Sequence, residues 1–343
     1  MQTDFSMASE VANNSIETNP YLISQEDRIS YYLNHQEVFE ISYSQFQEVK
    51  ERNFWNNKEL HLISFKQFKN TLAHWYCKNL IRRPFFKEIR ALPFYSDYRN
   101  LHSLMNFFEP FDKLEMSTKD AQYPVFYGEM GDTSPISCIR KSRTTEDMRS
   151  IIYNFRSIRH TDPCFEVRRK DIPWAAKNND VIWRGATTGK EHREKFVQKY
   201  FDQYDVAFST VKQKPNLAPY KKDRVSIAKQ LTYKYIVSLE GNELPSNRRW
   251  TLASNSVPIM PKPKWHSWIM EEKLEPYVHY LELNDDLSNL EELLNWAREN
   301  DEKCREIALN GKQFMAQFLD LENDLKVQKL LLEEFSKRTT YIN

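Results

Sequence analysis

The stretch from Asp180 to Met260 constrains the fold of this chain more than any other. It alternates short apolar runs, rich in β-branched and aromatic residues, with charged amphipathic segments. Such alternation predicts strands joined by helices, and therefore a parallel, doubly wound sheet of the α/β class. We expect a further strand from Tyr277 to Leu283 and a helix from Asp286. A last helix is predicted from Leu321 to Lys337.

Two apolar runs in this stretch end in the same kind of polar turn. The run Val181–Trp183 continues into Arg184–Gly189, and the run Tyr235–Glu240 continues into Gly241–Arg248. Each turn contains glycine, hydroxyl or amide side chains and an arginine, and each precedes a predicted helix. Open α/β sheets bind ligands at the carboxyl ends of their strands, and helix N-termini favour phosphate. The sequence therefore predicts a binding crevice for an anionic group at these two turns.

Glycine is scarce, and its positions are informative. The chain has six glycines, and none precedes Gly128. Glycine serves where a backbone must turn sharply or approach a ligand closely. The clustering of five glycines therefore suggests a site, with ordinary turns as the alternative for any one of them: Gly128, Gly131, Gly185, Gly189 and Gly241.

The part of the chain before this region is expected to be mainly helical. Residues 1–22 are polar and are predicted to be flexible. Apolar residues recur at three- and four-residue spacing over much of 24–111, which predicts helices. Short strands are expected at Pro124–Tyr127 and Ile136–Ile139, followed by a helix that begins near Glu146.

Two polar features surround the strand at Ile136–Ile139. Lys141, Ser142 and Arg143 follow it and provide cations and a hydroxyl that suit an anionic substrate group. Asp132 precedes it in a Gly-Asp-Thr turn, where its carboxylate is placed to accept a proton. A solvated turn is the alternative explanation for this aspartate.

Charge and cysteine content exclude several classes of protein. The net charge is +1, so no overall field attracts nucleic acid or an anionic membrane. The four cysteines are far apart and form no CxxC pair, which favours a reducing compartment. The first residues do not resemble a signal peptide, and no apolar run approaches the roughly 20 residues of a spanning helix. We therefore expect a cytoplasmic protein, at most peripheral to a membrane.

Several common catalytic motifs are missing. The sequence contains no P-loop, no GxGxxG, no GxSxG, no paired histidines and no Asp-x-Asp. We therefore expect neither a cofactor nor a metal, so that Arg184, Arg248 and the helix after Ser246 would have to neutralise an anion. Transfer of a sugar from a nucleotide-sugar has matching needs. The diphosphate leaving group gains negative charge in the transition state, and the acceptor hydroxyl needs a general base, for which Asp132 is our choice.

Several ordered segments resemble glycosyltransferase family 90. Trp183–Thr188, followed by Arg193, is similar to the WRG signature of that family, and Tyr233–Asn242 with Ser246–Trp250 is similar to its second signature. Further segments follow in the order of the family, and together the resemblance covers about Gly131 to Leu319: Ser254–Val257, Trp265–Trp268, Pro276–Tyr280 and Asp285–Leu287.

The resemblance implies a GT-B-like α/β fold, with two Rossmann-like domains facing a cleft and a helix-rich N-terminal half. It implies a UDP-sugar donor, inversion at the anomeric carbon and no metal. Within that frame we expect a flexible N-terminus at 1–22 and an acceptor-side domain at 23–175. A UDP-sugar-binding domain is expected at 176–320, and a C-terminal helix at 321–343 that packs back on the N-terminal domain.

The resemblance also implies roles for individual residues. Asp132 would be the catalytic base, with Asp120 and Glu129 as the alternatives. Lys141, Ser142 and Arg143 correspond to an element of the family that follows the loop with the base. The residues expected to bind the donor come from the two polar turns and the helix after the first: Arg184, Gly185, Thr187, Thr188, Arg193, Gly241, Asn242, Ser246, Asn247 and Arg248.

The family includes Rumi-type protein O-glucosyltransferases, capsule xylosyltransferases and bacterial lipopolysaccharide glycosyltransferases. Because no signal peptide is recognisable, the resemblance favours the bacterial branch. We expect transfer of a hexose, glucose or galactose, to the core oligosaccharide of lipopolysaccharide or lipooligosaccharide at the inner face of the membrane. The alternatives are the same chemistry on a capsule polysaccharide or a protein hydroxyl, and a non-catalytic nucleotide-binding or interaction module.

Overall fold

The structure is a computed structural model that describes residues 19–51, 60–65, 106–111, 113–118, 120–126, 131–156, 161–189 and 191–343. The chain divides into two compact units, each with its own main sheet. The five-stranded unit consists of Met1–Ile23, Arg159–Lys264 and Ile269–Asp320. The four-stranded unit consists of Ser24–Ile158, Trp265–Trp268 and Leu321–Asn343.

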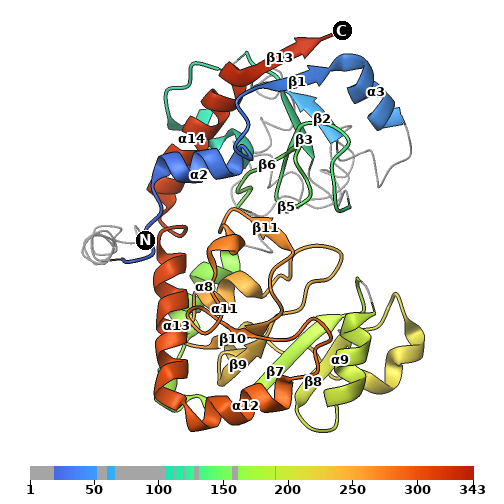
Figure 1. Cartoon of the computed structure of the whole chain (residues 1–343), viewed down its shortest axis with the longest axis vertical. Helices are drawn as coiled ribbons and strands as arrows, with labels where there is room; N and C mark the ends of the chain where they lie inside the picture. The colour runs from blue at the N-terminus through green and yellow to red at the C-terminus, as the bar shows by residue number, and fades with distance from the viewer. Residues whose placement is uncertain are drawn as a thin grey trace, which may run out of the picture. The chain divides into compact units, whose positions relative to one another are not determined.

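The five-stranded unit contains the parallel sheet that the sequence predicts. Its strands lie in the spatial order β12-β10-β9-β7-β8, and every neighbouring pair is parallel. Figure 1 labels β10, β9, β7 and β8 of this sheet. The middle of the sheet is fully buried, as expected for apolar runs covered on both faces. The strands are β7 (Asn178–Ala186), β8 (Asp205–Thr210), β9 (Tyr233–Val237), β10 (Val257–Met260) and β12 (Leu281–Glu282).

Helices connect and cover these strands. Alternate residues of a strand point to one face, and Trp183 and Tyr235 share a single apolar core with Phe196 of α9 and Leu294 of α12. Helix α11 packs against both α8 and α13. The helices are α8 (Asp162–Lys170), α9 (His192–Tyr200), α10 (Ile227–Gln230), α11 (Arg248–Leu252), α12 (Leu290–Glu299) and α13 (Asp301–Ala316), with 3₁₀ turns at Trp174–Ala176, Pro215–Tyr220 and Glu271–Lys273.

The strand order places a switch point at β7. The chain enters the sheet at β7, continues to β8 on one side, and then crosses to β9 on the other side. In open α/β sheets the loops after two such strands diverge and leave a crevice at their carboxyl ends. The polar turns predicted to bind an anion follow β7 and β9, and therefore flank this switch point.

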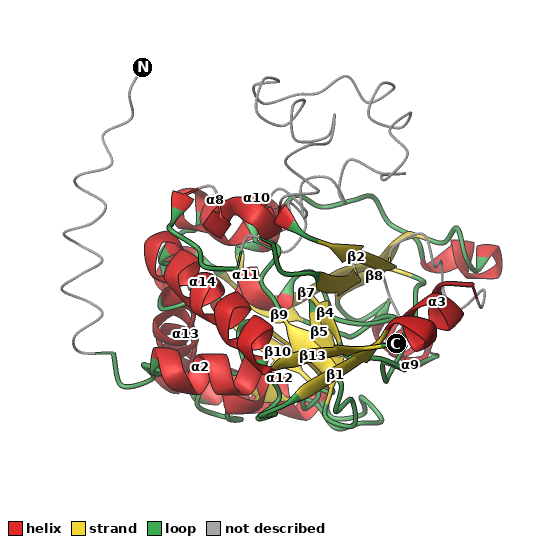
Figure 2. Cartoon of the chain, turned by 90° about the horizontal axis from the view of Figure 1, so that it is seen from above, coloured by secondary structure: helices red, strands yellow, loops and turns green. Residues whose placement is uncertain are grey.

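The four-stranded unit is a mixed sheet with helices and two small sheets. In the main sheet β2 and β3 are antiparallel, whereas β3, β4 and β6 run parallel. Helix α14 lies beside α2, and β1 lies beside β13 (Figure 2). The elements are α2 (Gln25–Tyr32), β1 (Phe39–Ser42), α3 (Tyr43–Glu51), β2 (Leu60–Ile63), β3 (Tyr123–Phe126), β4 (Cys138–Arg140), β5 (Ser142–Thr144), β6 (Ser150–Ile152), β11 (Trp265–Ser267), α14 (Leu321–Arg338) and β13 (Thr339–Ile342).

Some local predictions are wrong. The helix expected from Glu146 is a turn followed by β6, because the Asp147 carboxylate accepts the main-chain N–H groups of Arg149 and Ser150 and redirects the chain. The strand expected at Tyr277–Leu283 is limited to β12. Tyr277 has a positive φ of 61° and lies in a turn closed by its N–H and the Tyr280 carbonyl.

The region at 24–111 is also less helical than predicted, because the described part of it contains strands β1 and β2 besides α2 and α3. The last helix is confirmed as α14. No described helix has the length and apolar character that a membrane crossing requires. The proposed domain boundaries and the GT-B arrangement stay predictions.

Candidate functional site

The loops after β7 and β9 touch through their main chains. A β-carbon placed on Gly189 would lie 2.6 Å from the carbonyl carbon of Gly241, which is closer than real side chains ever come. Gly189 also has a φ of +93°, a conformation that other residues adopt only with strain. The two glycines therefore allow the loops to come together at the switch point.

Arg193, in the first turn of α9, bridges the same two loops. Its Nε donates to the Glu240 carbonyl at 2.9 Å and its Nη2 to the Leu239 carbonyl at 2.6 Å. Its Nη1 donates to the Ala186 carbonyl at 3.2 Å and to Thr188 Oγ1 at 2.9 Å. The side chain is buried. Arg193, predicted to bind the donor, thus holds the loop after β7 against the loop after β9.

Gly185 and Thr187, at the end of β7, each contact one specific side chain. A β-carbon on Gly185 would lie 2.4 Å from the Trp183 ring, so glycine lets that ring fold over the strand. Thr187 is buried, and its hydroxyl lies 3.3 Å from Gln213 Oε1 in the loop after β8. Gln213 was not predicted from the sequence, because nothing in the sequence links it to Thr187.

Arg184 has a partner on the neighbouring strand. It forms an ion pair with the Asp205 carboxylate and donates to the Asp205 carbonyl at 2.7 Å. Burial raises the pKa of Asp205, but the hydrogen bond and charge of Arg184 outweigh burial and hold that pKa below its usual value. Tyr233 also donates to this carboxylate, at 2.9 Å. Since Asp205 and Tyr233 begin β8 and β9, the Arg184 guanidinium lies toward the amino ends of the strands, away from the switch-point loops.

Arg248 lies at the start of α11 between two carboxylates. Its Nη2 donates to Glu240 Oε1 at 2.7 Å, and its Nη1 lies 3.6 Å from Glu271 Oε1. Glu240 Oε1 also accepts the main-chain N–H of Lys264 at 3.1 Å. The guanidinium is buried and oriented by these contacts. Because α11 has only five residues, a charge-based role here depends on the guanidinium more than on the helix.

The remaining donor candidates follow β9. Asn247 donates to the Val237 carbonyl at 2.7 Å and accepts from Ser238 Oγ at 3.1 Å, and so fixes the turn to the end of the strand. Ser246 is half-buried, and Asn242 is exposed.

Two residues that the sequence analysis missed join this site. His192 Nε2 lies 2.7 Å from the Glu240 carbonyl, and burial lowers the pKa of this imidazole. Glu240 contacts Arg193, His192 and Arg248 through its carbonyl or carboxylate. The sequence did offer a signal for Glu240, because its carboxylate directly precedes Gly241 in a turn that was expected to bind an anion.

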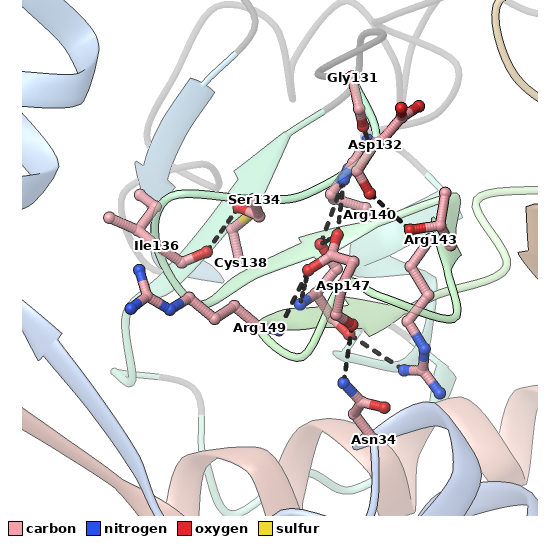
Figure 3. Close-up of polar contacts among 12 residues, drawn as sticks. Asn34, Gly131, Asp132, Ser134, Ile136, Cys138, Arg140, Arg143, Asp147 and Arg149 are labelled. Atoms are coloured by element: carbon pink, nitrogen blue, oxygen red, sulfur yellow. Dashed lines mark hydrogen bonds and ion pairs between the residues drawn. The ribbon is translucent and has the colours of Figure 1, made fainter.

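The other candidates lie in the four-stranded unit, where Asp132 is at the surface of a turn. Its carbonyl accepts from Thr144 Oγ1 at 2.7 Å, and the Gly131 carbonyl accepts from Arg140 Nη2 at 3.3 Å. Figure 3 shows the Asp132 carboxylate directed away from the buried ion pair of Arg140 and Asp147. The side chain is exposed, which allows contact with a substrate.

The predicted anion-binding residues of this unit differ in their surroundings. The Arg143 guanidinium is buried and donates to the carbonyls of Tyr31, Tyr32 and Ser150, the last two at 3.0 Å. It also lies 4.9 Å from the centre of the Tyr31 ring. Ser142 is buried in β5, and Lys141 is half-buried. Arg143 thus joins β5 to the end of α2.

Asp120 and Glu129 are the alternatives for the base. Asp120 is exposed, and Glu129 lies outside the described residues. In the described ranges no cluster of three histidine, cysteine or carboxylate side chains is arranged to hold a metal ion. The described cysteines, Cys138, Cys164 and Cys304, are buried thiols outside any disulfide of the described residues.

A parallel sheet with two polar loops locked together at its switch point is typical of nucleotide-binding α/β enzymes. Comparison with known protein families identifies a family for this chain. Residues 151–342, more than half of the chain, match the model of glycosyl transferase family 90. The chain belongs to this family, as the sequence motifs indicated.

Three curated relatives give the range of similarity. The O-glucosyltransferase LpsA of Dichelobacter nodosus is 31% identical over 215 residues, which cover 61% of this chain and 66% of LpsA. Human protein O-glucosyltransferase 1 is 28% identical over 49% of this chain and 44% of its own length. Zebrafish protein O-glucosyltransferase 2 is 32% identical over 41% of this chain and 29% of its own length. The chain thus spans less than two thirds of each relative.

Proposed function

We propose that the chain transfers a hexose from a UDP-sugar to a hydroxyl group of the core oligosaccharide of bacterial lipopolysaccharide or lipooligosaccharide. Membership of glycosyl transferase family 90 supports glycosyl transfer. Glucose is the first donor sugar to test, since relatives from a bacterium and from animals are named O-glucosyltransferases. Inversion at the anomeric carbon, independence of metal, a GT-B arrangement and a cytoplasmic location are parts of the same proposal.

One observation carries this proposal furthest: the contact of Gly189 with Gly241, secured by Arg193, at the switch point of the five-stranded sheet. A preorganised pair of loops at the carboxyl ends of parallel strands is where such sheets bind nucleotides. In the proposal Thr187, Thr188 and Asn242 line the donor there.

Charge on the leaving diphosphate is the second requirement. The negative charge of this group grows as the glycosidic bond breaks, and fixed cations lower the energy of that transition state. Arg248, oriented by Glu240 and Glu271, is the cation we assign to the diphosphate, together with the hydroxyl of Ser246. Arg184 and Arg193 contribute by holding the strand and the loops, given their contacts with Asp205 and with main-chain carbonyls.

The acceptor hydroxyl loses a proton as it attacks the anomeric carbon. Asp132 accepts that proton in the proposal, because its carboxylate is exposed on a turn whose main chain is tied down. A positioned general base contributes about 100-fold to 10,000-fold in rate. In the proposal Lys141 contacts an anionic group of the acceptor, while Ser142 and Arg143 belong to the adjacent strand β5.

The test uses purified protein, UDP-glucose or UDP-galactose, and lipooligosaccharide from cells that lack this chain. The expected result is a mass increase of the acceptor by one hexose with one of the two donors, and release of UDP. If the mass of the lipooligosaccharide stays unchanged and glucose is instead transferred to a protein, the acceptor is a protein hydroxyl and the proposed acceptor is wrong. Absence of UDP binding in a thermal-shift assay, together with absence of UDP-sugar hydrolysis, would contradict enzymatic function and favour an interaction module.

A further inference from the structure

The turn that carries Asp132 is held at two successive main-chain carbonyl groups. Arg140 Nη2 donates to the Gly131 carbonyl at 3.3 Å, and Thr144 Oγ1 donates to the Asp132 carbonyl at 2.7 Å. Gly131 has a φ of +86°, so the chain reverses sharply here. Both contacts hold the backbone and leave the Asp132 carboxylate directed outward (Figure 3).

Both anchors make further contacts within the four-stranded unit. Arg140 is buried, and its Nη1 lies 2.9 Å from Asp147 Oδ2 and 3.3 Å from Ser150 Oγ. The Asp147 carboxylate accepts two further main-chain N–H groups at 3.1 Å. Thr144 pairs with Trp265 across the β5–β11 ladder, and its carbonyl accepts the Asp147 N–H at 3.2 Å. The turn is therefore held by side chains of two successive strands, β4 and β5, which are themselves joined through Asp147.

We propose that Thr144 and Arg140 are positioning residues that set the location of the Asp132 carboxylate relative to the acceptor hydroxyl. A general base acts only within hydrogen-bond reach of the proton it removes, and a displacement of about 1 Å can cost on the order of 100-fold in rate. Loss of one of the two anchors would let the turn shift. This inference rests on the proposed role of Asp132 as the base.

Thr144 offers a cleaner test than Arg140. Substitution of Arg140 would leave the buried Asp147 carboxylate without its cation, which destabilises the fold strongly. Thr144→Val removes the hydroxyl, keeps the β-branched shape and suits a strand. Thr145→Val is the matched control, because Thr145 is exposed on the adjacent turn. Thr144→Ser keeps the hydroxyl and serves as the conservative variant.

The expected result is a fall in kcat of about 10-fold for Thr144→Val, on the scale of a modest displacement. UDP affinity should be unchanged, and Thr144→Ser and Thr145→Val should retain the wild-type rate. The probes are UDP itself for affinity, and UDP-glucose or UDP-galactose with the lipooligosaccharide acceptor for kcat. If the valine variant does not fold, Thr144→Ala replaces it.

A double-mutant cycle separates positioning from a general structural role. If Thr144 acts through Asp132, then Thr144→Val should cause no further loss of residual activity in an Asp132→Asn background. Equal losses in both backgrounds, or wild-type activity of Thr144→Val, would overturn the inference while leaving the proposed base in place. Wild-type activity of Asp132→Asn alone would overturn both the proposed base and the positioning role.

Discussion

The main chain of Gly189 lies directly against the main chain of Gly241, so that a β-carbon on Gly189 would lie 2.6 Å from the Gly241 carbonyl carbon. These glycines belong to different βα connections of the parallel sheet, one after β7 and one after β9. The two backbones meet directly at the switch point, and the Arg193 side chain bridges the loops beside this contact. In the proposed function the donor binds at these two loops.

Gly189→Ala should separate the two loops and weaken UDP binding. The new methyl group would overlap the Gly241 backbone, and the positive φ of residue 189 adds a strain of roughly 1–2 kcal/mol for a residue with a side chain. Calorimetric titration with UDP measures the effect, and we expect a loss of at least about tenfold in affinity, corresponding to about 1.4 kcal/mol.

The matched control for that substitution is Gly311→Ala in α13. A β-carbon there would lie 3.2 Å from Leu252 Cδ2, and the residue contacts neither switch-point loop. Gly311→Ala should keep UDP affinity whatever its effect on stability. Equal affinity of Gly189→Ala and the wild type would show that the loops are not part of the donor site.

Arg193→Lys should weaken UDP binding nearly as much as Arg193→Ala. Lysine keeps the positive charge, but its single ammonium group cannot reach four oxygens in two loops as the planar guanidinium does. A direct contact of Arg193 with the diphosphate predicts the opposite, namely that lysine retains most of the affinity. UDP titration of both variants therefore shows whether Arg193 holds the two loops together or contacts the diphosphate directly. Arg298→Ala, on the exposed side of α12, is the control.

His279 should make stability depend on pH in a defined direction. Burial lowers the pKa of this imidazole below its usual 6.5, and the Glu275 N–H donates to its Nδ1 at 3.0 Å. As the pH falls through about 6.5, the unfolded chain binds a proton that folded His279 does not bind, so stability decreases. A depressed pKa in half-buried His192 acts in the same direction.

Urea unfolding at about pH 7.5 and about pH 5.5 measures this dependence. His279→Asn keeps an acceptor near the Glu275 N–H but does not titrate. It should lose less stability between the two conditions than the wild type, by at most about 1.4 kcal/mol per pH unit. Identical pH dependence of the two proteins would contradict the lowered pKa.

The parallel sheet was predictable because its strands are buried on both faces and appear as continuous apolar runs, such as Val181–Trp183. The polar turns after β7 and β9 were recognisable because each combines glycine, hydroxyl or amide side chains and an arginine before a predicted helix. The roles of Arg193 and Thr144 were not, since their partners are mostly main-chain carbonyls, which leave no mark in a sequence. The turn at Asp147 was mistaken for a helix because its carboxylate binds nearby backbone N–H groups in place of starting a helix.

Other features depend on contacts between distant parts of the chain. Strand β1 pairs with β13, near the opposite end of the chain, and Arg28 lies 3.5 Å from Asp324 in the interior of the four-stranded unit. Neither segment shows a local pattern that indicates its partner. The ion pair of Arg184 with Asp205 also joins residues that no local pattern links. In the proposed function Arg184 therefore holds neighbouring strands together and does not contact the donor.

The central claim is that this chain transfers a sugar with Asp132 as the general base, and one comparison tests it most directly. Transfer from UDP-glucose or UDP-galactose to lipooligosaccharide is measured for the wild type, for Asp132→Asn and for the control Asp120→Asn, with UDP affinity measured in parallel. We expect Asp132→Asn to bind UDP normally and to lose transfer by about 100-fold or more, with Asp120→Asn unaffected. Full activity of Asp132→Asn would contradict the account.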